Sequence, residues 1–74
     1  MQEFKNYSLQ IRNRIRENRK RLGLSQEQLA EAIDCSREHI ARIENGKINI
    51  GLENFIKLAQ FFNITLDELA GYKL

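Results

Sequence analysis

The sequence contains no proline and one cysteine, and these scarcities exclude several classes of protein. Cys35 cannot form a disulfide within the chain, so no disulfide framework stabilises the fold. No cysteine–histidine cluster is present that could hold a structural zinc ion, and we expect no metal and no cofactor. The lone thiol fits a reducing compartment.

Long apolar segments are missing as well. No apolar run reaches the roughly 18 residues of a membrane-spanning helix. Residues 1–9 mix Glu3, Lys5 and Asn6 with apolar residues and lack the continuous apolar region of a signal peptide. We therefore expect a soluble cytoplasmic protein without membrane contact.

The length of 74 residues predicts one domain over residues 1–74, with residues 1–8 as an N-terminal arm. A chain this short buries only about 60% of its unfolded surface, so its core is small. Without disulfides or metal, a second copy of the chain is the remaining common source of buried area.

The net charge of +2 by itself indicates little about the partners of the protein, but the distribution of the charges along the chain is informative. Basic residues crowd one segment, and acidic residues dominate the next: Arg12, Arg14, Arg16, Arg19, Lys20 and Arg21, followed by Glu27, Glu31, Asp34, Glu38 and Glu44. The basic block is either a footprint for phosphate or a solvated helix face. One helix cannot present all of these side chains to DNA, so we expect one or two of them near phosphates.

Apolar spacing and punctuation by glycine, asparagine, serine and threonine predict an all-α fold of five helices. The expected helices are Leu9–Arg21, a short helix from the cap Ser25 to about Asp34, Ser36–Asn45, Leu52–Phe62, and Leu66–Ala70 after the cap Thr65. Gln28 and Glu68 stand at the capping-box positions that follow two of these caps.

Each expected helix carries an apolar stripe for the core. The stripes are Ile11, Ile15 and Leu22; Leu29, Ala30 and Ile33; Ile40 and Ile43; and Leu52, Phe55, Ile56, Leu58, Ala59 and Phe62. The helix at residues 52–62 has the strongest stripe of the chain.

Two short helices joined by a tight turn over Gln26–Asn45 form a helix-turn-helix pattern. At about 100° per residue, Ile40 and Ile43 point together into the core. The opposite face of that helix holds Glu38, Ala41, Arg42 and Asn45, with Arg37 at its edge. Long hydrogen-bonding side chains around a small alanine suit a helix lying in a DNA major groove.

These residues resemble a known family. The run Leu22-Gly-Leu-Ser-Gln-Glu-Gln-Leu-Ala-Glu-Ala-Ile33, followed by Ser36-Arg-Glu-His-Ile-Ala-Arg-Ile-Glu-Asn-Gly-Lys47, is similar to the phage Cro/repressor-type family, also called the xenobiotic-response-element family. Residues 52–59 and 64–69 match the last two helices of that family. The resemblance covers residues 11–70 and implies a compact, lambda-repressor-like five-helix domain.

The resemblance also implies roles for single residues. Those at base-reading positions are Ser36, Arg37, Glu38 and Arg42, and those at phosphate-contacting positions are Gln26, Asn45 and Lys47. Arg19 and Glu44 match an ion pair that ties the first helix to the third.

The sequence departs from the family at three places. Asp34 replaces the usual glycine of the turn, which costs some stability because an L-residue disfavours left-handed geometry. Ile50-Gly51 replaces a common Pro-Ser, so the next helix lacks a hydroxyl cap. Glu38 is a carboxylate at a base-reading position, where it could accept a hydrogen bond from cytosine but also faces phosphates.

Simpler interpretations accompany these roles. Arg42 could pair with Glu38 four residues earlier on the same helix, and Gln26 could be a solvated first-turn residue. His39 is expected to be a partly buried structural residue. Cys35 is expected to be a small turn residue, the alternative being an exposed thiol that senses oxidants.

Apolar residues at the C-terminal end predict a dimer interface of Phe61, Leu66, Leu69 and Tyr72. Phe61 lies off the apolar stripe of its helix, and the other three continue an apolar run in a short tail. The alternative is that these residues only seal the monomer core.

The sequence thus predicts a DNA-binding transcriptional regulator, namely a homodimeric repressor that reads a palindromic operator. The alternative is a protein-interaction module, such as an antitoxin with a toxin or another inhibitor as its partner. An enzyme is not expected, because no nucleophile lies at a suitable spacing from a base and no catalytic residue is identified. The operator and the direction of regulation are not encoded in any recognisable motif.

Overall fold

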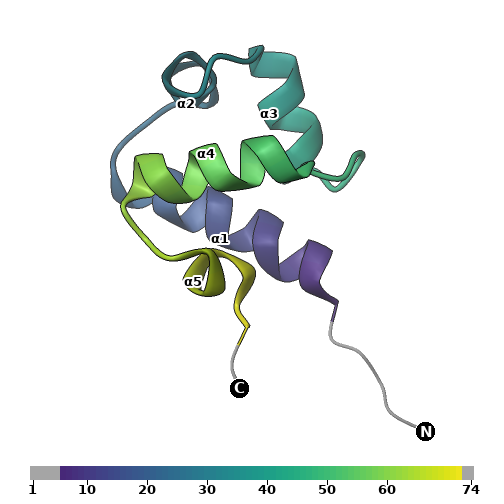
Figure 1. Ribbon diagram of the computed structural model, residues 1–74. Helices are drawn as coiled ribbons and strands as arrows, with labels where there is room; N and C mark the ends of the chain where they lie inside the picture. Colours follow the sequence, from purple (N-terminus) through teal and green to yellow (C-terminus); the bar gives the residue numbers. More distant parts are fainter. Residues whose placement is uncertain (1–5, 73–74) are drawn as a thin grey trace, which may run out of the picture.

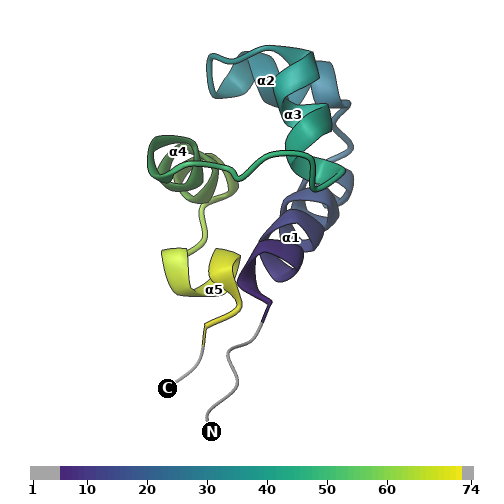
Figure 2. The same cartoon turned by 90° about the vertical axis from the view of Figure 1, so that its right-hand side faces the viewer.

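The structure, a computed structural model, describes residues 6–72 and contains five helices in that range. They are α1 (Tyr7–Arg21), α2 (Gln26–Ala32), α3 (Arg37–Glu44), α4 (Leu52–Phe62) and α5 (Leu66–Ala70). Figures 1 and 2 show α2 and α3 together at one end of α1, with α5 near the other end and α4 between them. Over residues 6–72 there is no strand and no helix able to cross a membrane. The predicted all-helical, five-helix fold is confirmed.

The core draws on all five helices. Its buried apolar residues are Ile15, Leu29, Ala30, Ile33, Ile40, Ile43, Leu58, Ala59, Phe62 and Leu69. Half-buried apolar residues, among them Ile11, Cys35 and Phe55, pack against this cluster. The stripes expected for the second and third helices are confirmed.

Three residues expected in the core lie at the surface instead. Leu22 is exposed, because it is the C-cap of α1 and lies past the face that packs on the other helices. Leu52 and Ile56 are exposed on α4, Leu52 to 74%. This helix has more apolar residues than one face can bury, so those at the edge of the stripe remain in contact with solvent.

The helix starts follow the capping residues of the sequence. The Ser25 hydroxyl accepts a hydrogen bond from the backbone N–H of Gln28, whose side chain accepts one from the Ser25 N–H, which completes a capping box. Thr65 caps α5 in a similar way, because its hydroxyl oxygen accepts a hydrogen bond from the Glu68 N–H at 3.0 Å. Gly51 precedes α4 without a side-chain cap, as the sequence predicts.

The first helix begins two residues earlier than the sequence suggests. The Asn6 side chain accepts a hydrogen bond from the Leu9 N–H at 3.1 Å and so acts as the N-cap. Tyr7 and Ser8, assigned to the arm from the sequence, therefore belong to α1. The rest of the expected arm, residues 1–5, lies outside the described residues.

Candidate nucleic-acid interface

The segment from α2 to α3 has the geometry of a helix-turn-helix. Ile40 and Ile43 of α3 are buried against the core that α2 also enters. In the turn, Asp34 has a φ of 59°, which is left-handed geometry, and the Cys35 N–H donates to the Ala30 carbonyl at 2.9 Å. Aspartate thus occupies the conformation for which the family resemblance implies glycine.

The outer face of α3 is polar and open to solvent. Arg37, Glu38, Arg42 and Asn45 are exposed, and Ala41 between them is half-buried. These side chains recur at spacings of about four residues, so they share one side of the helix. Within the described residues Glu38 and Arg42 form no ion pair, since the distances between their charged atoms exceed the ion-pair limit. The alternative pairing considered from the sequence is therefore absent, and both side chains project from α3.

Ser36 has a structural task as well as its expected contact with DNA. Its hydroxyl oxygen accepts a hydrogen bond from the His39 N–H at 3.1 Å and caps α3. The hydroxyl hydrogen is not used in this bond, so Ser36 keeps a donor for a second partner.

Asn45 and Lys47 lie where α3 ends. Asn45 is the C-cap, Gly46 follows with a φ of 72°, and the Lys47 N–H donates to the Arg42 carbonyl at 2.8 Å. This hydrogen bond closes the last turn and fixes the backbone from which the exposed Lys47 side chain extends.

A buried carboxylate fixes α3 to α1. The Arg19 guanidinium donates two hydrogen bonds to Glu44, one from Nε to Oε2 at 2.8 Å and one from Nη2 to Oε1 at 2.9 Å. The side chain of Glu44 is 1% exposed and that of Arg19 is 12% exposed. The ion pair expected from the resemblance is therefore present and almost completely removed from solvent.

Gln26 binds the same carboxylate. Its amide Nε2 donates to Glu44 Oε1 at 3.2 Å, which links the first turn of α2 to the last turn of α3. The amide has a second N–H that this bond leaves unused. The Gln26 side chain is therefore not freely solvated, and one of its two amide N–H groups is still available for a further hydrogen bond.

Two further arginines of α1, which are not among the site residues predicted from the sequence, reach the end of α3. Arg16 Nη2 donates to the Glu44 carbonyl at 2.9 Å, and Arg16 Nε lies 3.7 Å from Glu44 Oε1. The Arg12 guanidinium lies against Gly46, in the space that a side chain there would need. The signal was available, because residues 12, 16 and 19 share one face of a helix. Cations suit this place, where the free carbonyls of α3 carry partial negative charge.

The pKa of Glu44 reflects competing effects. Burial by itself raises the pKa of this carboxyl group. Hydrogen bonds from Arg19 and Gln26, together with the charges of Arg19 and Arg16, outweigh burial and hold the pKa below its ordinary value. Glu44 is therefore ionised at neutral pH and holds three side chains in place.

His39 lies on α3 and Cys35 lies in the turn before it, and the contacts of both are structural. His39 is half-buried, and its Nε2 lies 3.1 Å from Asn54 Nδ2, a hydrogen bond that joins α3 to α4. Cys35 packs against the core, and burial raises the pKa of its thiol. A raised pKa leaves little thiolate at neutral pH, which favours the structural interpretation of Cys35 over an oxidant sensor.

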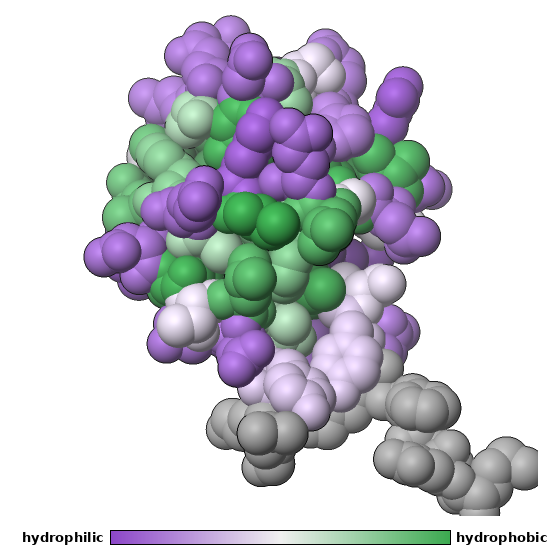
Figure 3. All heavy atoms as spheres, viewed as in Figure 1, coloured by the Kyte–Doolittle hydropathy of each residue, from purple (hydrophilic) through white to green (hydrophobic). Residues whose placement is uncertain are grey.

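The residues expected at a dimer interface divide into two groups. Phe61, Leu66 and Tyr72 are exposed, whereas Leu69 is 0% exposed and belongs to the monomer core. The assignment of Leu69 to a dimer surface is therefore wrong, because α5 turns this side chain inward. Figure 3 shows further apolar side chains on the face that carries α4, where Leu52 and Ile56 are exposed.

Comparison with known proteins agrees with this geometry. A family model described as Helix-turn-helix (HTH_3) matches residues 15–69. An uncharacterised HTH-type transcriptional regulator of Archaeoglobus fulgidus is 41% identical over 59 residues, which are 80% of this chain and 84% of that protein. The control protein C.MunI of a Mycoplasma species is 43% identical over 58 residues, which are 77% of this chain and 78% of that protein.

A solved structure extends the likeness to three dimensions. The restriction-modification controller protein C.AhdI of Aeromonas hydrophila superposes with a TM-score of 0.77 at 37% identity, over 84% of this chain and 94% of that one. The matched family model spans α2, α3 and α4, together with the second half of α1 and most of α5. The chain therefore belongs to the Cro/repressor-type helix-turn-helix family of DNA-binding transcriptional regulators.

Proposed function

We propose that this protein is a homodimeric repressor that reads a palindromic operator by placing α3 in the major groove. The observation that carries the proposal is the division of α3 into two faces. Ile40 and Ile43 are buried, while Arg37, Glu38 and Arg42 project from the opposite side around the small Ala41. Side chains that can hydrogen-bond to base edges thus stand on a helix held rigidly by the core.

Base reading is assigned to the first and middle turns of α3. Arginine forms two hydrogen bonds with guanine, and carboxylates accept one from cytosine. Arg42 is free of Glu38, so its guanidinium is available for a base. Arg37, Glu38 and the remaining hydroxyl hydrogen of Ser36 complete the reading set.

Phosphate contacts are assigned to the residues around the end of α3. Gln26 is oriented by Glu44 and keeps one N–H for an oxygen of the DNA backbone. Asn45 and Lys47 are exposed at the end of α3, and the Lys47–Arg42 hydrogen bond fixes the backbone there. Such contacts position a protein on the duplex without reading its sequence.

A dimer is proposed because one such domain makes few base contacts. Two copies related by a two-fold axis double them and read half-sites about 34–36 Å apart, one turn of DNA. Leu66 and Tyr72 give each monomer exposed apolar area at the end formed by α5, and Phe61 adds more at the end of α4.

The likeness to C.AhdI, which covers nearly all of that controller, favours a narrower second candidate within this class. A controller of a restriction-modification system would bind upstream of the genes it regulates. Sequencing the genomic fragments that the purified protein retains tests this candidate. Retained fragments without neighbouring restriction or methyltransferase genes would contradict it.

Selection from random duplex oligonucleotides tests the main proposal. The wild type should enrich a motif with two-fold symmetry, and its binding should weaken steeply with salt as phosphate contacts release counterions. Arg42→Ala should relax preference at one base pair of each half-site, each good contact being worth about 1–3 kcal/mol of discrimination.

Lys47→Ala provides the matched variant for that experiment. It should weaken binding to all sequences about equally and lower the salt slope by about one. Absence of any enriched motif at low salt would contradict sequence-specific binding. If Arg42→Ala enriches the same motif as the wild type, the result contradicts the base-reading role of Arg42 but not sequence-specific binding by the protein.

A further inference from the structure

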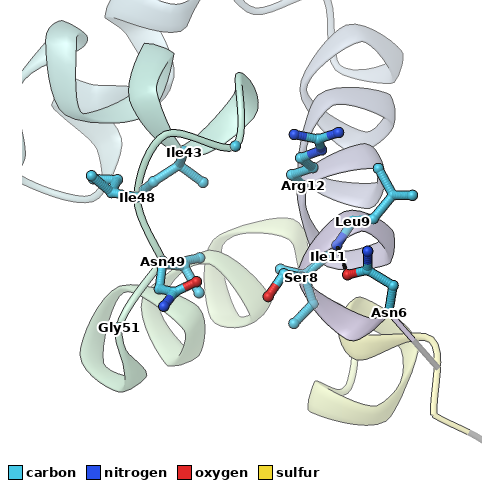
Figure 4. A pocket seen from close by; sticks show the side chains of 11 residues that line it. Asn6, Ser8, Leu9, Ile11, Arg12, Ile43, Ile48, Asn49 and Gly51 are labelled. Carbon is cyan, nitrogen blue, oxygen red and sulfur yellow. Dashed lines mark hydrogen bonds between the residues drawn. The ribbon is translucent and has the colours of Figure 1, made fainter. Parts of the chain in front are cut away.

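A groove with a volume of about 420 Å³ lies between the start of α1 and the loop that follows α3. Leu9, Ile11 and Arg12 line it from α1, and Ile48, Asn49 and Ile50 line it from the loop. Figure 4 shows the groove between these two segments: Ile43 and Ser8 point into it, whereas Leu9 and Ile48 point outward. The volume falls within the range of roughly 300–1,000 Å³ typical of pockets for small molecules.

The lining has a definite chemical character. Aliphatic side chains, among them Ile11, Ile43 and Ile50, and uncharged polar side chains, namely Asn6, Ser8 and Asn49, both line it. Among the described residues that line the groove, Arg12 alone carries a charge. A groove with aliphatic side chains, one cation and no carboxylate among its described lining residues favours a ligand with an aliphatic part and one negative charge.

Arg12 keeps its charge unpaired within residues 6–72. Its guanidinium lies against the Cα side of Gly46, where any other residue would place a Cβ. No described carboxylate forms an ion pair with it, in contrast to Arg16 and Arg19, which both contact Glu44. The Arg12 guanidinium is therefore available to bind an anion in the groove.

We propose that this groove binds a small branched-chain monocarboxylate. The carboxylate accepts hydrogen bonds from the Arg12 guanidinium, which are stronger than bonds between neutral groups because both partners are charged. The aliphatic chain lies against Ile11, Ile43 and Ile50 and is removed from water.

The site also connects to the DNA-binding surface, a step that rests on the proposed function. Gly46 borders the groove and stands between Asn45 and Lys47, both assigned to phosphate. A bound carboxylate adds negative charge beside them, so it lowers the affinity for DNA. DNA in turn lowers the affinity for the acid by the same factor.

Titration of the full-length, isotope-labelled protein without DNA tests the site, with 4-methylpentanoate as probe and 4-methylpentanamide as its uncharged counterpart. The acid should shift the backbone amide signals of Ile11, Gly46 and Ile48 in a saturable way. It should bind roughly tenfold more tightly than the amide, the factor expected for a hydrogen bond to a charged group. No saturable shift, or equal affinities for acid and amide, would overturn the proposal.

Two variants test whether the charge of Arg12 causes the preference for the acid over the amide. Arg12→Gln should reduce the affinity for the acid to that for the amide, whereas Lys20→Gln, which removes an exposed charge elsewhere on α1, should change neither. Equal losses in both variants would indicate a general effect of net charge and would overturn the role of Arg12.

The DNA-linked step is measured separately, as the affinity for the selected operator with and without the acid. An unchanged affinity would overturn the coupling. Failure of the protein to bind DNA at all would contradict the proposed function, and the DNA-free titration would still decide the site.

Discussion

At the scale of single residues, Glu44 joins three helices. Its carboxylate accepts hydrogen bonds from Arg19 and Gln26, and its backbone carbonyl accepts one from Arg16. These bonds connect α1, α2 and α3 at one point. A buried charge of this kind is stable only while its partners are present.

Glu44→Ala should therefore destabilise the protein strongly. Removing the carboxylate leaves Arg19 nearly buried without its partner, which typically costs about 3–5 kcal/mol. Urea unfolding at neutral pH measures the loss. Glu31→Ala, an exposed change on α2, is the control and should stay within about 0.5 kcal/mol of the wild type. Equal small losses in both variants would contradict the buried ion pair.

The lowered pKa of Glu44 predicts a pH dependence of stability. The folded state binds the proton more weakly than the unfolded chain, whose ordinary value is about 4.5. The stabilisation is therefore fully present above pH 4.5 and is lost as the pH falls through the lower folded-state pKa. The free energy of unfolding of the wild type, minus that of Glu44→Gln, should decrease over this range. A constant difference from pH 7 to pH 3 would show that Glu44 does not titrate with folding.

At the scale of elements, the turn between α2 and α3 sets the angle at which α3 is presented. Asp34 holds this turn with a φ of 59°. Left-handed geometry costs an L-residue roughly 1–2 kcal/mol, whereas the greater freedom of glycine in the unfolded chain costs about 0.5–1 kcal/mol. The two costs are close, and the first is the larger.

Asp34→Gly should accordingly stabilise the protein by roughly 0.5–1 kcal/mol, the difference between these two costs. Thermal or urea unfolding measures the change. Asp67→Gly, in the first turn of α5, is the matched control and should lose up to about 1 kcal/mol because glycine disfavours helix. A loss of stability in both variants would mean that the Asp34 side chain stabilises the turn by more than its strain costs.

At the scale of the whole molecule, the exposed apolar residues indicate where a second copy would bind. Leu66 and Leu69 are three residues apart on α5, yet Leu66 faces solvent and Leu69 is buried. The Tyr72 N–H donates to the Asp67 carbonyl at 3.0 Å, which keeps Tyr72 at the end of this short helix.

Leu66→Glu should give a folded monomer, whereas Leu69→Asp should unfold, because it places a charge in the core. Sedimentation at micromolar concentration, together with circular dichroism, distinguishes the two results. Leu52→Glu on α4 tests the other exposed apolar surface. A monomer produced by Leu52→Glu, with Leu66→Glu still dimeric, would move the interface from α5 to α4.

The sequence by itself determined the helices, the turn between α2 and α3, and most of the core. Apolar spacing and caps such as Ser25 and Ser36 act within a few residues, so they can be recognised without the fold. The polar face of α3 followed from the same periodicity. The pairing of Arg19 with Glu44 required the family resemblance, since nothing local connects residues that far apart in the chain.

The tertiary structure alone decided which of the apolar residues are buried and which are exposed to solvent. Leu52 and Leu69 are both leucines in amphipathic helices, yet one is exposed and the other is completely buried. The outcome depends on how α5 packs against α1 and α4, which no short segment encodes. The packing of α1 on α3 brings Arg12 and Arg16 to the end of α3, because side chains meet there from helices that are distant in sequence.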